Sequence, residues 1–386
     1  MISRNLLSRL SSIDWDFAGT QSESPFSAIH FHPCRFASQV PATLIGLLSK
    51  PGDLILDPFV GSGTTLVEAQ RLGRESFGIE LNPIAVIASK AKTLNSPATV
   101  ISSLICTLKY EAGVYVGRQM STVKGRVEPS IPNSVQIEKW YTPQVAEDLG
   151  RLWAFLRNLE GDVRIIAEAA FSAVLLPVCR ETRHWGYVCD NTTPKNDHEG
   201  NVLGEFSRVL DRLDRAYRDR DAEIAASGKA ADPIKVATIH AGAAAGILIG
   251  QPRSSVDLVV TSPPYFGVCD YIKAQRLSME WFAINIEDLR LVEIGARSKR
   301  HRGKALTEYL DELRTVFTAL HRCMKKEAAM AVILGESARR ASVLADLRLV
   351  LKDAGFTVRL EINRNVSTQR RMAPSITGEY LFILCK

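Results

Sequence analysis

The sequence lacks the features that mark membrane, secreted and disulfide-stabilised proteins. It contains no run of about eighteen apolar residues, and its N-terminus has no basic segment followed by an apolar one. Its seven cysteines are scattered without a paired spacing, which favours a reducing compartment. It also has no internal repeat and no low-complexity segment. We therefore expect a soluble, cytoplasmic protein without a membrane partner.

The composition permits several classes of globular protein. The 386 residues are 46% hydrophobic, which is enough for one large domain or two with a sizeable core. The net charge of +6 allows a nucleic-acid partner but does not establish one, because many cytosolic enzymes are as basic. No zinc-ligand spacing is formed by Cys179, His184, Cys189 and His198, so no metal site is expected.

The stretch from Asp57 to Thr65, DPFVGSGTT, organises the chain. Three apolar residues before it predict a buried strand, and the apolar residues after it recur at helical spacing. Gly61 and Gly63 permit the tight turn between the two. A strand, a glycine loop and a helix N-terminus leave backbone N–H groups free to face a ligand. A phosphate-binding P-loop is excluded, because threonines occupy the positions that require Lys followed by Ser or Thr.

A second short apolar strand follows in FGIELNP and ends at Glu80. An acidic side chain at this point of an open α/β sheet can accept hydrogen bonds from both hydroxyls of a ribose, which predicts a nucleoside ligand. The stretch from Asp57 to Pro83 resembles the cofactor-binding motifs of S-adenosylmethionine-dependent DNA amino-methyltransferases. The resemblance implies cofactor contacts from Asp57, Pro58, Phe59, Gly61, Ser62, Gly63, Thr64, Thr65, Glu80, Leu81 and Asn82.

The segment FHPCRFASQVPATLIGLLS, residues 31–49, is similar to the segment that encloses the methionine end of the cofactor in this family. The resemblance implies that Arg35 or Phe36 has this role. A solvent-facing helix start is the alternative interpretation. The strand that begins near Ile234 ends at Gly242 and Ala243, where the family commonly has an acidic residue that touches adenine, so the adenine contact stays open.

A second motif, DLVVTSPPYFGVCDY, runs from Asp257 to Tyr271. An apolar strand ends in a rigid turn that offers a hydroxyl, a carbonyl and an aromatic ring at the carboxyl edge of the sheet. Both motifs are therefore expected to face one crevice. Two acceptors and a ring suit a planar base with an exocyclic amine. This strand and turn resemble the catalytic motif of DNA N4-cytosine methyltransferases, which implies catalytic roles for Ser262, Pro263, Pro264 and Tyr265.

The resemblance implies a defined chemistry for this turn. The Ser262 hydroxyl and the Pro263 carbonyl accept from the amine of a base flipped out of double-stranded DNA, and Tyr265 stacks on that base. No cysteine precedes or lies within the turn, as attack on a ring carbon would require. Cys269 lies just downstream in a predicted helix, and we interpret it as a packing residue.

The expected fold is α/β, a Rossmann-like class I methyltransferase sheet with a large helical insertion. Residues 1–95 and 235–386 are expected to form the catalytic core. Helical patterns dominate residues 96–234, a region expected to recognise the target sequence. They are clearest at Val145–Leu159, Val163–Leu176 and Phe206–Ile224. Further helices are predicted at 84–92, 270–282, 307–324 and 341–354, and the last two strands at 356–365 and 379–386.

Basic residues outside the two motifs are candidates for DNA contact, with ion pairing or a solvated charge run as the alternative. The loop RSKRHRGK runs from Arg297 to Lys304. The other basic candidates are Arg180, Arg183, His184, Arg370 and Arg371, and the aromatic Trp185 follows the first three in the sequence.

The function expected from the resemblance is site-specific DNA methylation at cytosine N4, with a cognate restriction endonuclease as an open partner. The cofactor motif precedes the catalytic motif, whereas N4-cytosine members often show the reverse order, so the subclass stays open. An N6-adenine methyltransferase and a tRNA guanine N2-methyltransferase are alternatives, although both tend to have Asp where Ser262 stands. A noncatalytic DNA-binding subunit is the alternative from a different class.

Overall fold

The structure is a computed structural model of the chain. It describes residues 2–17, 24–29, 37–116, 128–180, 193–194, 198–226, 234–337, 342–364 and 376–386. Several predicted residues fall outside these ranges. They are Arg35, Phe36, Arg183, His184, Trp185, Arg370 and Arg371.

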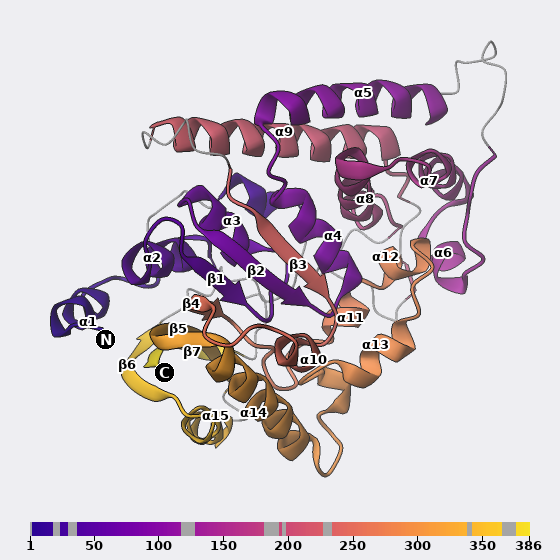
Figure 1. Cartoon of the computed structure of the whole chain (residues 1–386). Helices are drawn as coiled ribbons and strands as arrows, with labels where there is room; N and C mark the ends of the chain where they lie inside the picture. Colours follow the sequence, from indigo (N-terminus) through magenta and orange to yellow (C-terminus); the bar gives the residue numbers. More distant parts are fainter. Residues whose placement is uncertain are drawn as a thin grey trace.

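A seven-stranded sheet forms the centre of the molecule (Figure 1). Its order is β3-β2-β1-β4-β5-β7-β6, and all neighbours are parallel except β7, which runs antiparallel to both β5 and β6. This confirms the predicted Rossmann-like class I methyltransferase sheet and its last two strands. The strands are β1 (Leu54–Asp57), β2 (Glu75–Glu80), β3 (Ala237–Ala241), β4 (Val256–Thr261), β5 (Met324–Ser337), β6 (Thr357–Arg364) and β7 (Ile376–Cys385).

Helices cover both faces of the sheet, because neighbouring strand residues point to opposite sides. Ile55 packs in the cluster on one face, whereas Leu56 packs in the cluster on the other. The first face carries α1 (Arg4–Ser11), α2 (Gln39–Leu48), α3 (Thr64–Arg71) and α4 (Pro83–Lys92). The second face carries α10 (Ala244–Ile249), α14 (Ala305–Cys323) and α15 (Ser342–Asp353). Trp15, which follows α1, is buried in the core of the first face.

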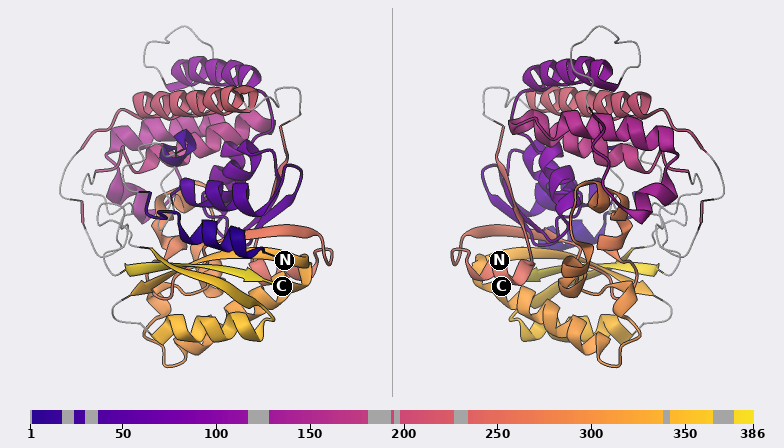
Figure 2. Two further views of the ribbon diagram at one scale, coloured as in Figure 1. Left: turned by 90° about the vertical axis from the view of Figure 1, so that its left-hand side faces the viewer. Right: turned by 90° about the vertical axis from the view of Figure 1, so that its right-hand side faces the viewer.

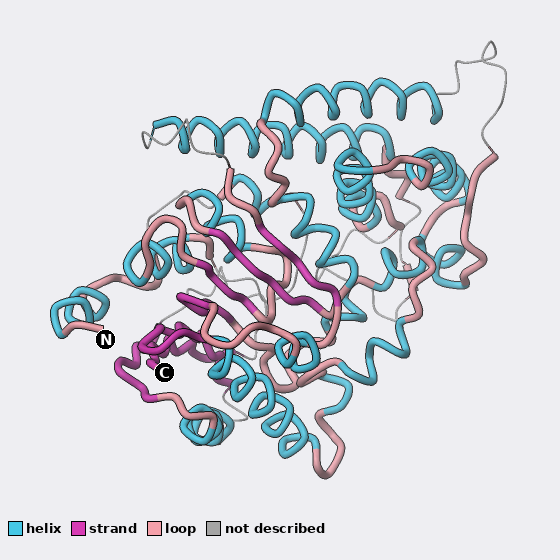
Figure 3. The backbone as a smooth tube through the Cα atoms, in the orientation of Figure 1, coloured by secondary structure: helices cyan, strands magenta, loops and turns pink. Residues whose placement is uncertain are grey.

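A helical region connects α4 to β3 and stands above the sheet in both side views (Figure 2). It contains α5 (Ala98–Val116), α6 (Val135–Trp140), α7 (Pro143–Leu156), α8 (Gly161–Leu175) and α9 (Val202–Ala226). The long helices α5 and α9 lie side by side, farthest from the sheet (Figures 1 and 3). The hydrophobic cluster of this region also includes Phe26 and Ile29 near the N-terminus and Trp281, which follows the Ser262–Tyr265 turn. The region therefore shares part of its core with the part of the chain that carries the sheet.

The segment after the Ser262–Tyr265 turn differs from the prediction of one helix over residues 270–282. Two short helices form instead, α11 (Tyr271–Ala274) and α12 (Arg276–Trp281), because Gln275 between them has non-helical dihedral angles, φ −105° and ψ 20°. Cys269 lies in a loop and not in the predicted helix. Gly267, two residues earlier, has a left-handed backbone with φ 62°, and its N–H donates to the carbonyl of Gly295, so the backbone is not helical there. The described part of the chain also contains η1 (Pro25–Ala28), α13 (Ile286–Val292) and η2 (Arg297–Lys299).

None of the described helices is both long and apolar enough to cross a membrane.

Candidate active site at the carboxyl edge of the sheet

The glycine loop between β1 and α3 depends on backbone shapes that only glycine adopts at low cost. Gly61 and Gly63 have φ values of 54° and 90°. A Cβ on Gly63 would also lie 2.7 Å from the Cβ of Ser89 in α4, so the loop and this helix approach closely. Gly61 therefore suits the turn of the loop, and Gly63 is required where the loop meets the neighbouring helix.

Asp57 is the last residue of β1, and its carboxylate connects the glycine loop to the end of β4. Its carboxylate accepts hydrogen bonds from Thr65 Oγ1 and Thr261 Oγ1, both at 2.7 Å, and from the backbone N–H of Phe59 at 3.0 Å. Burial raises the pKa of Asp57 from 3.8 to about 6, although these three donors lower it. Asp57 thus fixes the glycine loop against the end of β4.

Glu80 ends β2 and borders the glycine loop. Its Oε2 accepts from the backbone N–H of Gly61 at 2.7 Å, and its Oε1 accepts from the N–H of Asn82 at 2.8 Å. Burial raises the pKa of Glu80 from 4.5 to about 7, against the effect of these two donors. A carboxylate offers about four acceptor sites, so each oxygen keeps capacity for one further donor. Asn82 caps α4 by accepting from the N–H groups of Ile84 and Ala85.

The turn after β4 is held by hydroxyl groups. The Tyr309 hydroxyl donates to the carbonyl of Pro264 at 3.0 Å. Ser262 Oγ donates to the Tyr265 hydroxyl at 3.2 Å, and that hydroxyl donates to Glu379 Oε1 of β7 at 3.2 Å. Tyr265 is buried. Its ring fills the space beside Gly335 of β5, where a Cβ would lie 2.3 Å from the tyrosine Cε2.

One cavity of about 370 Å³ is lined by residues of both motifs, as the sequence predicts. The predicted residues that line it are Pro58, Phe59, Gly61, Ser62, Thr64, Glu80, Leu81, Asn82, Ser262, Pro263, Pro264 and Tyr265. Asp57, Gly63 and Thr65 are buried and do not line it. The region of the undecided adenine contact, Gly242 and Ala243, also faces the cavity.

Two buried polar atoms of the cavity lining lack a hydrogen-bond partner within the described part of the chain. They are Ser62 Oγ and Glu293 Oε2. The other oxygen of Glu293 accepts from the N–H groups of Tyr271 at 2.5 Å and Ile272 at 3.3 Å. Burial raises the pKa of Glu293 to about 7. Unsatisfied buried polar atoms are costly, so both atoms favour a polar ligand in this cavity.

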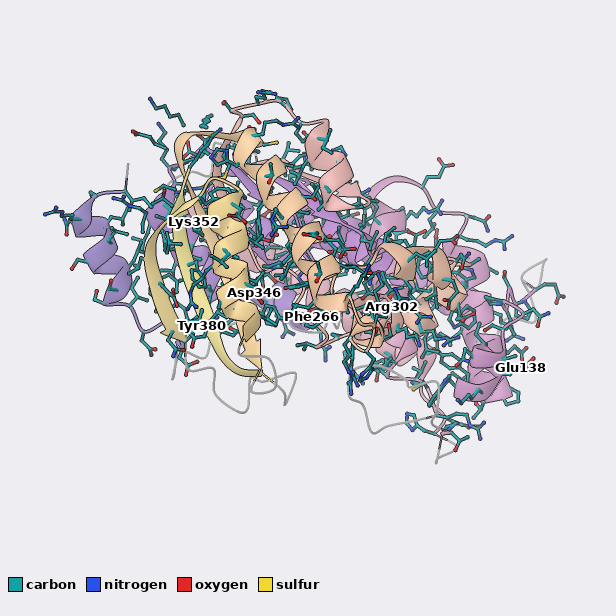
Figure 4. The ribbon with its side chains drawn as sticks, turned by 90° about the horizontal axis from the view of Figure 1, so that it is seen from below. Glu138, Phe266, Arg302, Asp346, Lys352 and Tyr380 are labelled. Carbon is teal, nitrogen blue, oxygen red and sulfur yellow. The ribbon has the colours of Figure 1, made fainter. Side chains whose placement is uncertain are left out.

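The basic loop lies next to the rim of this cavity. Lys299 Nζ donates to the carbonyls of Leu291 and Glu293, at 2.9 and 2.8 Å. Leu291 is 73% exposed and also lines the cavity. In the view from below, Arg302 lies between Phe266, directly after the Ser262–Tyr265 turn, and Glu138 of α6 (Figure 4). Arg302 is exposed and belongs to the loop whose Lys299 contacts the cavity rim.

The sequence motifs did not include several residues that support the site. Lys92 of α4 is buried, and its Nζ donates to the carbonyl of Ser62 at 3.0 Å. Glu293, Tyr309 and Glu379 are likewise distant from both motifs in sequence. One available signal was a charged residue inside a strand pattern, as with Glu379 at the start of EYLFILCK. In the described ranges, no group of three or more His, Cys, Asp or Glu side chains is arranged to hold a metal ion.

Comparison with known proteins gives partial matches. Residues 9–90 match the model of the DNA methylase family N6_N4_Mtase. The type II methyltransferase M.MvaI of Kocuria varians is 26% identical over an alignment that covers 70% of this chain and 61% of that protein. M.MjaII of Methanocaldococcus jannaschii is 20% identical over 84% of this chain and 75% of its own length.

Among solved structures, the rRNA methyltransferase aviRa from Streptomyces viridochromogenes covers 95% of this chain at 9% identity, with a TM-score of 0.39 over 94% of its own length. A likeness at this level carries no functional argument, so the fold assignment stands on the sheet order. The first relative is matched over about three fifths of its length. The family model and the sequence relatives together support a DNA methyltransferase, a class of enzyme whose methyl donor is S-adenosylmethionine.

Proposed function

We propose that this chain transfers a methyl group from S-adenosylmethionine to the exocyclic N4 of a cytosine flipped out of double-stranded DNA. One observation carries the proposal: the Ser262–Tyr265 turn and the glycine loop with Glu80 line the same cavity. A methyl donor held by the loop would therefore lie next to a base held by the turn. Such a transfer is a direct displacement, which depends on alignment more than on acid or base strength.

The cavity suits the proposed cofactor. Its volume lies within the usual range of roughly 300 to 1,000 Å³ for small-molecule sites, and its lining includes backbone groups and a buried carboxylate. The Glu80 oxygens would accept from the two ribose hydroxyls, and the glycine loop would lie along the methionine part. When bound, S-adenosylmethionine supplies an electrophilic methyl group on a sulfonium. The partnerless Ser62 hydroxyl is a further candidate contact.

The turn would activate the target amine. The lone pair of the cytosine amine is delocalised into the ring, which makes the amine a poor nucleophile. Acceptors at Ser262 Oγ and the Pro263 carbonyl would hold its two N–H bonds and localise the lone pair toward the methyl group. Tyr265 lines the cavity and is our proposed stacking partner, with Gly335 supporting its ring.

The proposed organisation places target recognition in residues 96–234 and the catalytic core in residues 1–95 and 235–386. The helical region and the core pack on each other through Trp281 and Phe26, so sequence-reading elements and the cavity would be held in a fixed relation. The basic loop would bind DNA phosphates beside the cavity. A cognate restriction endonuclease is a proposed partner, and resistance of methylated DNA to cleavage would identify it.

The test is the product. Purified protein, duplex DNA of mixed sequence and S-adenosylmethionine are incubated, the DNA is digested to nucleosides, and these are separated by mass spectrometry against standards. N4-methyldeoxycytidine, formed much more slowly by a Ser262→Ala variant, is the expected result. N6-methyldeoxyadenosine would reassign the target base. Methylation of tRNA alone, or no product with either nucleic acid, would overturn the proposal.

A further inference from the structure

A chain of hydrogen bonds leads from the catalytic turn into the C-terminal strands. Ser262 Oγ donates to the Tyr265 hydroxyl and the Tyr265 hydroxyl donates to Glu379 Oε1, both at 3.2 Å. The other oxygen of Glu379, Oε2, accepts from Arg364 Nη1 at 2.7 Å. Arg364 and Glu379 are directly paired residues on β6 and β7. The chain thus joins a residue of the cavity wall to an ion pair of the sheet.

The far end of this chain is fixed by burial and by a backbone contact. Arg364 is 4% exposed, and its Nε donates to the carbonyl of Trp15 at 3.1 Å. Tyr265 is 5% exposed, and its ring packs against Gly335. The contact is so close that Gly335 could not carry a Cβ without a shift of the ring. Burial raises the pKa of Glu379, and the neighbouring Arg364 guanidinium and Tyr265 hydroxyl offset this only in part. The ion pair with Arg364 at 2.7 Å is the geometry of a carboxylate, which can only accept hydrogen bonds.

The direction of every bond in the chain follows from this end. Tyrosine has a single hydroxyl proton, and Tyr265 uses it in the hydrogen bond that it donates to the Glu379 carboxylate. The tyrosine oxygen then offers Ser262 only lone pairs, so the Ser262 proton must point toward Tyr265. The lone pairs of Ser262 are consequently left for a donor in the cavity. Without the carboxylate, the tyrosine hydroxyl can donate its proton to Ser262, which reverses the direction of the hydrogen bond between them.

We propose that Glu379 is a positioning residue that acts through Tyr265 to keep the Ser262 hydroxyl an acceptor for the amine of the target base. The proposal rests on the proposed methyl transfer to an exocyclic amine. It assigns the buried Glu379–Arg364 pair a role in the orientation of one catalytic proton. It also gives the Tyr265 hydroxyl a task that is distinct from stacking by its ring.

The test is a double-mutant cycle on turnover. Glu379→Gln replaces the carboxylate with an amide that can donate to tyrosine, and Tyr265→Phe removes the link but keeps the ring beside Gly335. Each single variant should lower kcat on the order of tenfold, the effect of one lost hydrogen bond. S-adenosylmethionine affinity should not change. The double variant should lose no more than either single one, because both changes break the same chain.

Glu361→Gln is the control, because Glu361 is on the neighbouring strand β6 and also pairs with an arginine, Arg348, but lies outside the hydrogen-bond chain from Ser262 to Arg364. It should leave kcat unchanged. Additive losses in the double variant, or wild-type turnover by Tyr265→Phe, would overturn the proposal. Should Glu379→Gln not fold, Tyr265→Phe alone decides, since it leaves the ion pair intact. Wild-type protein that forms no methylated deoxynucleoside would instead refute the proposed function itself.

Discussion

The two sides of the cavity, the glycine loop with Glu80 and the Ser262–Tyr265 turn, are stabilised by different kinds of contact. On the cofactor side, the supporting bonds join residues close in sequence, as when Glu80 accepts from Gly61 and Asn82. On the proposed catalytic side, the Ser262–Tyr265 turn is held by residues from distant elements, among them Tyr309 of α14 and Glu379 of β7. The first side is a local unit of two strands and two helices. The second depends on the pairing of β4 with β5 and of β5 with β7.

Asp57 is the link between these two sides. It accepts from Thr65 at the start of α3 and from Thr261 at the end of β4, and it is almost fully buried. We therefore expect two separable roles with one shared support. Substitutions on the cofactor side should change binding, and substitutions on the catalytic side should change turnover.

The largest expected effect is that of Ser262→Ala. The variant removes one of the two proposed acceptors of the base amine, and turnover should fall roughly 10²-fold or more, as for other single positioned polar groups in active sites. The affinity for S-adenosylmethionine should stay close to that of the wild type. Single-turnover rates and calorimetry on the same preparation measure the two quantities. An equal loss in both would mean that the sides are not separable.

Glu80→Ala should give the opposite pattern. Loss of charge-assisted hydrogen bonds to the ribose is expected to cost about 1.5 to 3 kcal/mol, or roughly ten- to a hundredfold in cofactor affinity. Turnover at saturating cofactor should change much less. Glu75→Ala is the matched control, because Glu75 begins the same strand and its side chain is exposed. Unchanged cofactor binding by Glu80→Ala in calorimetry would sink the ribose assignment.

The same contrast explains what could be predicted from the sequence. The proposed cofactor side could be predicted because its contacts are local. The helix predicted from Ile84 to Lys92, for example, corresponds to α4, Pro83–Lys92. The supports of the catalytic turn could not be predicted in this way, since Gly335 and Glu379 reach it only through strand pairing. The single helix predicted over residues 270–282 was wrong for a related reason. Its second half turns at Gln275, and Trp281 there enters the core of the helical region.

A smaller effect is expected from pH. The pKa of Glu80 is about 7 in the folded protein and 4.5 ordinarily, so the folded state binds more protons between these values. The resulting stabilisation is complete below about pH 4.5 and is lost as the pH rises through about 7. Ligand-free protein should therefore show a lower Tm at pH 8 than at pH 6. Asp57, Glu68 and Glu293 have raised pKa values from burial too and add to this trend.

Two substitutions separate the contribution of Glu80. Glu80→Gln should reduce the difference in Tm between pH 6 and pH 8, whereas Glu287→Gln on the exposed surface of α13 should not. S-adenosylmethionine should raise the Tm more at pH 8, because the carboxylate is the form that accepts from both hydroxyls. A Glu80→Gln protein with the full wild-type difference would show that another acid causes the trend.

The smallest expected effect concerns the basic loop and DNA. Arg302 is exposed, whereas Lys299 is partly buried and donates to the carbonyls of Leu291 and Glu293 at the cavity rim. If Arg302 binds a phosphate, Arg302→Gln should weaken all DNA sequences alike and flatten the slope of log K against log salt by up to about 0.9. Lys299→Gln should change that slope less, because its ammonium group already serves the rim. Fluorescence anisotropy titrations at several salt concentrations measure both slopes. An unaltered slope for Arg302→Gln would mean that this part of the loop is a solvated charge run, and an equal change for both variants would mean that the rim contacts give way when DNA binds.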